Sequence, residues 1–159
     1  MRLIDANLKG NVIQYILQCI IATAALMLVL FYMDIGLDTT IVASIGATSF
    51  IIFTMPNTKR AKAFYILGGY AVGTLVGVVA NTVLLMELGV PINILGALTV
   101  GISMFIMVIT NTEHPPASAL ALAIAINGYT SKSIIFVYGV AISLLMIKWI
   151  LRKWLINLW

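Results

Sequence analysis

The sequence predicts an all-α polytopic membrane protein with about six membrane segments, and two observations carry that prediction. Hydrophobic residues make up 62% of the 159 positions, whereas Asp, Glu, Lys and Arg together make up only 9%. A soluble domain carries about 25% charged residues, so this composition excludes an ordinary soluble domain. The hydrophobic residues also gather in runs that short polar links separate, four of them long and two short. We expect a single transmembrane domain over residues 1–159 and no soluble domain.

Four of the predicted segments are long enough to span a bilayer. A helix rises 1.5 Å per residue, so about 20 residues cross a hydrocarbon core of about 30 Å. The first long segment follows a charged stretch, the second follows a basic turn, and the third follows a link that contains Gly89 and Pro91. The fourth ends among basic residues. The long segments are predicted over residues 12–33, 63–86, 94–110 and 134–151.

The other two segments are short. One, over residues 40–55, follows the polar link at residues 34–38. The other, over residues 116–126, rises only about 16 Å and cannot cross a bilayer alone. The order is therefore long, short, long, and again long, short, long, with the second half upside down relative to the first. We expect a 3+3 inverted repeat, an arrangement that is common in transporters.

The charged residues predict the orientation. If every segment crosses the membrane, eight of the nine Lys and Arg residues lie on the side of the N-terminus, and only Lys132 lies opposite. The positive-inside rule assigns the basic side to the cytoplasm. We expect a multi-pass protein of the cell membrane with both termini cytoplasmic. The pI is about 9.4, but the basic residues flank apolar runs, which is the orientation signal of a membrane protein. We therefore expect the lipid bilayer as a partner and no nucleic acid.

A polar break before the second short segment is the main candidate site. It contains the only histidine of the chain and two consecutive prolines. Proline suits the first turn of a helix, so we expect a helix start at Pro115-Pro116 with His114 near its cap and free N–H groups from Ala117 to Ala119. His114 either contacts substrate or only caps this helix. The candidate substrate-binding residues here are Thr112, His114, Pro115, Pro116, Ala117 and Ser118.

The first short segment contains a polar stretch of small residues that could form the other half of the site. Gly46 lets the backbone break or approach another helix closely. By the predicted symmetry, two short helices would point their N-termini at one another near the membrane midplane. Helix N-termini bind anions through free N–H groups and the helix dipole. The candidates in this stretch are Gly46, Ala47, Thr48 and Ser49.

Charged and glycine residues outside this site have simpler expected roles. Glu113 is either a proton-carrying residue or a solvated residue of the inner mouth. The basic turn mainly sets the topology and could draw anions to the mouth through Lys59, Arg60 and Lys62. Glycines at every fourth position let helices pack closely, and they are Gly69, Gly73 and Gly77.

Signatures of enzymes are missing from the sequence. The single His and the single Cys are far apart, and no phosphate-binding loop or dinucleotide motif occurs. We therefore expect no metal, no cofactor and no catalytic activity. An intramembrane enzyme that uses Glu113 and His114 is a minor alternative.

Three stretches resemble the HPP family of integral membrane proteins. The first is Thr112-Glu113-His114-Pro115-Pro116-Ala117-Ser118-Ala119, the second is Ile45-Gly46-Ala47-Thr48-Ser49, and the third runs from Pro56 through Gly68-Gly69 to Gly77-Val78. The resemblance implies a small multi-span protein, and some family members are implicated in nitrite transport. The family often has Gly in place of Ser118 and His in place of Tyr70.

The sequence and the resemblance together favour a transporter or channel for a small inorganic anion, most simply nitrite, bound near the membrane midplane. The alternative is a non-transporting scaffold or subunit of a larger complex, with the glycine face as its association surface. Six short crossings bury little surface within one chain, so we expect a homo-oligomer, either a dimer or a trimer.

Overall fold

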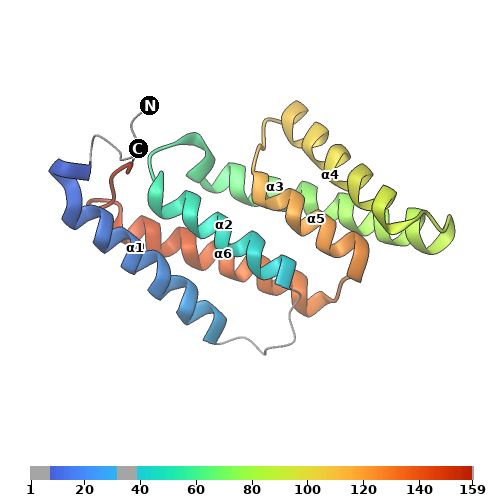
Figure 1. Cartoon of the computed structure of the whole chain (residues 1–159), viewed down its shortest axis with the longest axis horizontal. Coiled ribbons are helices and arrows are strands. Elements are labelled where there is room, and N and C mark those ends of the chain that lie inside the picture. The colour runs from blue at the N-terminus through green and yellow to red at the C-terminus, as the bar shows by residue number, and fades with distance from the viewer. Residues whose placement is uncertain (1–7, 32–38, 159) are drawn as a thin grey trace.

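The computed structural model describes residues 8–31 and 39–158, and within these ranges the chain forms six α-helices (Figure 1). Two further elements lie among them, the 3-10 turn η1 (Lys59–Ala61) and the π-helix η2 (Ala80–Glu87), which continues α3. The predicted end of the first segment at residue 33 and the link at residues 34–38 lie outside the described residues. The helices are α1 (Leu8–Phe31), α2 (Thr39–Thr54), α3 (Ala63–Val79), α4 (Ile92–Ile109), α5 (Pro115–Asn127) and α6 (Ser131–Leu151).

The lengths of these helices confirm the predicted pattern of four long and two short segments. Within the described residues, four stretches are long and apolar enough to cross a membrane, at Gly10–Leu28, Ala63–Glu87, Ile92–Ile109 and Ser131–Leu151. The helices α2 and α5 are apolar but shorter. Large apolar side chains stay exposed on the outside of the bundle, among them Phe105 and Ile150. Such a surface is suited to lipid rather than water, and the protein is a multi-pass membrane protein.

Successive helices run in alternating directions, so that α1 begins and α6 ends at the same end of the bundle (Figure 1). The short helix α2 packs against α1, α5 and α6, and the short helix α5 packs against α2, α3 and α4. Each short helix therefore contacts the first helix of its own half and the third helix of the other half. This pairing is the one that a 3+3 repeat requires, and the repeat itself remains a prediction.

The end of the bundle where α6 finishes holds several basic groups. Lys148, in the last turn of α6, donates to the carbonyl of Ala61 in η1 over 2.6 Å. Beyond α6 the chain folds back, and Gln18 of α1 accepts from the N–H of Ile156 and donates to its carbonyl. The basic turn and the end of α6 therefore meet at one end of the protein.

One prediction about α2 is wrong. The helix is continuous from Thr39 to Thr54, so Gly46 and Ser49 lie in its middle rather than at a helix end. A glycine inside a helix costs only about 1 kcal/mol, which is less than the cost of leaving backbone groups unpaired in lipid. Within residues 8–31 and 39–158, no second half-helix therefore points its N-terminus at that of α5.

Candidate functional site

The chain enters the candidate site through a sharp stop at the end of α4. Asn111 adopts a positive φ of 53°, a conformation that Asn tolerates better than most residues. The N–H of Thr112 donates to the carbonyl of Met107 and the N–H of Asn111 to that of Val108, which is the Schellman pattern of a helix end. The connection then runs on to His114, which is extended and precedes Pro115 at the first position of α5. The predicted helix start at the two prolines is confirmed.

The glycines of α3 make room for this connection. A Cβ on Gly69 would lie 2.4 Å from the Cβ of His114, and a Cβ on Gly73 would lie 2.4 Å from the carbonyl oxygen of Ala117. Only glycine lets α3 and the start of α5 approach this closely. The prediction of a packing face is therefore correct, but α5 of the same chain covers it. The face is not available as the association surface that the scaffold alternative requires.

His114 lies at the centre of a buried polar cluster, which we define as His114, Thr48, Tyr70 and Ser44. The imidazole has no exposed surface, and its Nε2 lies 2.9 Å from the hydroxyl of Thr48 in α2. The Thr48 hydroxyl also lies 2.6 Å from that of Tyr70 in α3. Ser44, one turn before Thr48, donates to the carbonyl of Pro116 over 2.7 Å. Two helices, α2 and α3, thus converge on the start of α5.

His114 is the N-cap residue of α5, as predicted, but in the described structure its side chain makes no capping hydrogen bond. The expected free N–H of Ala117 is wrong. It donates to the carbonyl of His114 over 2.9 Å, and the two prolines before it have no N–H at all. The start of α5 therefore offers an anion the helix dipole but few backbone donors.

A cavity of about 250 Å³ adjoins the buried cluster on the side of α4. It is lined by Met104, Met107, Val108, Glu113, His114, Pro115 and Ser118. The Nδ1 of His114 is buried and has no hydrogen-bond partner among the residues that the structure describes, which is rare for a buried polar atom. The cavity is therefore bordered by a residue with an unused nitrogen.

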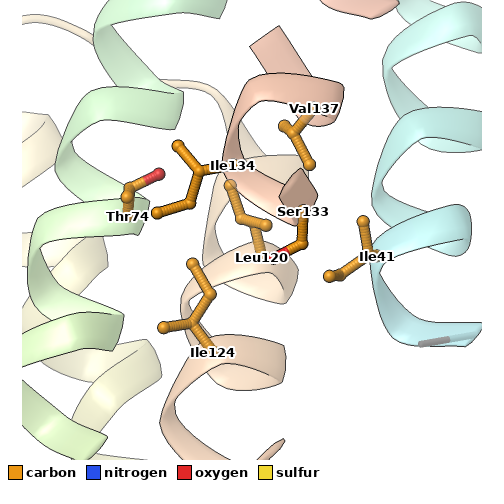
Figure 2. A pocket seen from close by; sticks show the side chains of 7 residues that line it. All are labelled: Ile41, Thr74, Leu120, Ile124, Ser133, Ile134 and Val137. Carbon is orange, nitrogen blue, oxygen red and sulfur yellow. The ribbon is translucent and has the colours of Figure 1, made fainter. Parts of the chain in front are cut away.

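A narrow crevice lies toward the opposite end of α5, between α2, α3, α5 and α6 (Figure 2). Figure 2 shows Thr74 of α3 on one side and Ile41 of α2 on the other, with Leu120 of α5 between them. The hydroxyl of Thr74 is buried and has no partner in the described part of the chain. The crevice itself has no space for a water molecule.

Charged residues stand at the mouth of the cavity. Lys59 of η1 forms an ion pair with Glu113 at 2.9 Å, and both side chains are partly exposed. The hydrogen bond from Lys59 to Glu113 raises the pKa of the lysine above its ordinary value. Arg60 and Lys62 are exposed beside it. The predicted mouth residues thus lie at one entrance, with Glu113 in the cavity wall.

The structure brings some predicted site residues together and leaves others apart. His114, Pro115 and Ser118 line the cavity. Thr48 belongs to the buried cluster, and the carbonyl of Pro116 accepts a hydrogen bond from Ser44 of that cluster. Thr112 packs against Gly68, whereas Ala47 is exposed and Ser49 is buried outside the cavity wall. Sequence reasoning missed Ser44 and Tyr70 as members of the cluster. The helical spacing of Ser44 and Thr48 was the available signal for Ser44.

Comparisons with known proteins agree with this architecture. Residues 7–156 match a family model described as HPP, transmembrane region. The chain is also similar to a transmembrane protein from Dictyostelium discoideum, with 31% identity over 103 residues. That alignment covers 63% of this chain and 36% of the relative, so the matched region spans about a third of the relative's length. No solved structure matches the chain.

Proposed function

Because the chain belongs to the HPP family of transmembrane proteins, we propose that it is a transporter for a small inorganic anion, with nitrite as the leading candidate. The observation that carries the proposal is the cavity that ends at His114. A buried histidine with an unpartnered nitrogen, placed where a membrane helix begins inside the bundle, is typical of a substrate site.

The size of the cavity supports a small substrate. Its volume of about 250 Å³ is well above the ~10–15 Å³ that one water molecule needs. A triatomic anion would therefore fit together with several water molecules. The surface of the wall is almost wholly apolar, and Ser118 and His114 border it as buried polar residues. A wall of this kind suits a weakly hydrated ion.

The distribution of charged residues supports the proposal that the substrate is an anion and that it enters from the basic end of the protein. The cations that gather there are Lys59, Arg60, Lys62, Lys148, Arg152 and Lys153. Such a cluster raises the local concentration of anions at the mouth. By the positive-inside rule this end is cytoplasmic, so we propose that both termini face the cytoplasm and that the cavity opens inward.

The same reasoning bears on partners. We propose a homo-oligomer, a dimer or a trimer, because the exposed apolar faces of α1 and α4 leave much surface for lipid or a second copy. Chemical crosslinking in native membranes would detect it, and a monomer at every protein density would contradict it. We propose no catalytic step and no cofactor.

Uptake of nitrite into proteoliposomes tests the transport function. The protein should give saturable uptake above empty vesicles, and His114→Ala should abolish it. The control is Ser143→Ala, because the Ser143 hydroxyl is exposed on α6 and donates to the carbonyl of Gly139 in its own helix. Uptake that equals empty vesicles, or full uptake by a monodisperse His114→Ala protein, would overturn the proposal.

A further inference from the structure

The hydrogen bonds around Thr48 favour one position for the proton of the neutral His114 imidazole. The Thr48 hydroxyl contacts three groups, the carbonyl of Ser44 at 3.0 Å, the hydroxyl of Tyr70 and the Nε2 of His114. A hydroxyl has one hydrogen and two lone pairs. A carbonyl can only accept, so the Thr48 hydrogen points to Ser44. All three contacts are then satisfied only if Tyr70 and Nε2 of His114 both donate to Thr48.

This assignment leaves Nδ1 of His114 as a bare lone pair. The atom is buried and without a partner among the described residues. A lone pair repels an anion and accepts either a proton or a hydrogen-bond donor. The neutral site therefore cannot hold a bare anion against Nδ1 of His114, a residue that borders the cavity.

No other described group around His114 can supply a positive charge. Thr48 and Ser44 face it from α2 and Tyr70 faces it from α3, with Tyr138 of α6 behind Tyr70. The α4 wall of the cavity consists of Met104, Met107 and Val108. Glu113 is the neighbouring acid, and it is paired with Lys59 at the mouth. Among the described residues, no Lys or Arg is buried.

We infer that the anion enters the cavity together with one proton, which binds Nδ1 of His114, so that transport moves one proton with each anion. This inference rests on the proposed function and specifies how the site accepts its substrate. The proton comes from a hydronium ion that enters with the anion: one O–H bond of the hydronium breaks, the oxygen keeps the electron pair and stays behind as water, and the Nδ1–H bond forms. The imidazolium then donates to the anion, and the proton leaves with it, so His114 returns to its neutral form. The net charge moved is zero.

The test is an electrical one in proteoliposomes that contain a pH-sensitive dye. Nitrite uptake and internal acidification are measured with the membrane potential clamped at zero and at about 100 mV by potassium and valinomycin. Empty vesicles correct for nitrous acid that crosses lipid unaided. We expect one proton for each nitrite and the same accumulation at both potentials. An anion that crossed alone would change its accumulation about 50-fold per 100 mV.

The outcomes separate the inference from the function. Saturable uptake that depends on potential and brings no acidification overturns the inference and leaves the transporter intact. No protein-dependent uptake overturns both. In His114→Gln, the side-chain amide can still donate to Thr48 but has no lone pair that takes a proton at neutral pH. We expect this variant to lose coupled uptake, and a His114→Gln protein that still carries one proton per nitrite overturns the role of His114.

Discussion

Replacing Thr48 by Val is the sharpest test of the buried cluster. Valine has the shape of threonine, so the change removes the hydroxyl and leaves the packing intact. His114 Nε2–H then loses its acceptor, whereas the Tyr70 hydroxyl still has the carbonyl of Ser44 within 3.4 Å. Hydrogen bonds between membrane helices contribute about 0.6 kcal/mol on average, and an unsatisfied buried donor costs about 1–3 kcal/mol. We expect a loss of about 2–4 kcal/mol in the free energy of unfolding.

The control for this change is Thr82→Val. The Thr82 hydroxyl donates to the carbonyl of Val78 one turn earlier, as Thr48 does to Ser44, but it contacts no other helix in the described structure. Its loss should cost less than about 1 kcal/mol. Reversible unfolding in mixed micelles titrated with sodium dodecyl sulfate measures both values by tryptophan fluorescence. Equal losses for the two variants would refute the reasoning, because the contacts to His114 and Tyr70 would then contribute nothing.

Three further predictions test other parts of the structure. Gly73→Ala places a Cβ 2.4 Å from a backbone oxygen of α5 and should lower the free energy of unfolding by about 1–3 kcal/mol in the same titration. The control is Gly139→Ala, whose Cβ meets no described atom within 4 Å, and it should leave the free energy of unfolding unchanged. Asn111→Gly should keep the stop of α4, but Asn111→Val should cost about 1–2 kcal/mol because of the positive φ; equal stability of both would contradict the Schellman end. Lys59→Gln should leave stability unchanged and slow uptake at low salt, since it leaves Glu113 unpaired at the mouth. That difference should disappear at high salt.

The sequence predicted the helices well because their signals are local. A run of apolar residues long enough to cross a bilayer has few alternatives in lipid. The start of α5 was equally clear, because Pro115 and Pro116 fit a first helical turn and little else in a membrane segment. The glycine face of α3 was also recognisable, although its partner was not, since spacing shows that a close approach occurs and not which helix makes it.

The site was predictable only in part. Thr48 and His114 were both candidates, but Tyr70 joins them through the packing of α3 against α5, and no local pattern encodes that contact. The break expected at Gly46 did not form because neighbouring residues of α2 bury apolar surface as one helix. Small polar residues in a membrane segment therefore indicated the right region of α2 for the wrong structural reason. They contribute hydroxyl groups from one continuous face rather than backbone donors from a helix end.

The two prolines explain why a proton and an anion would arrive together. They deprive the first turn of α5 of backbone donors, and the N–H of Ala117 is already bound to the carbonyl of His114. The partial positive charge of the helix start remains, and it disfavours protonation of the adjacent His114 when no anion is present. An anion alone meets the lone pair of Nδ1. When both are present, the imidazolium supplies the donor that the prolines withhold, and the dipole stabilises the anion. In the proposed mechanism, His114, Pro115 and Pro116 act as one unit, in which neither charge is favoured without the other.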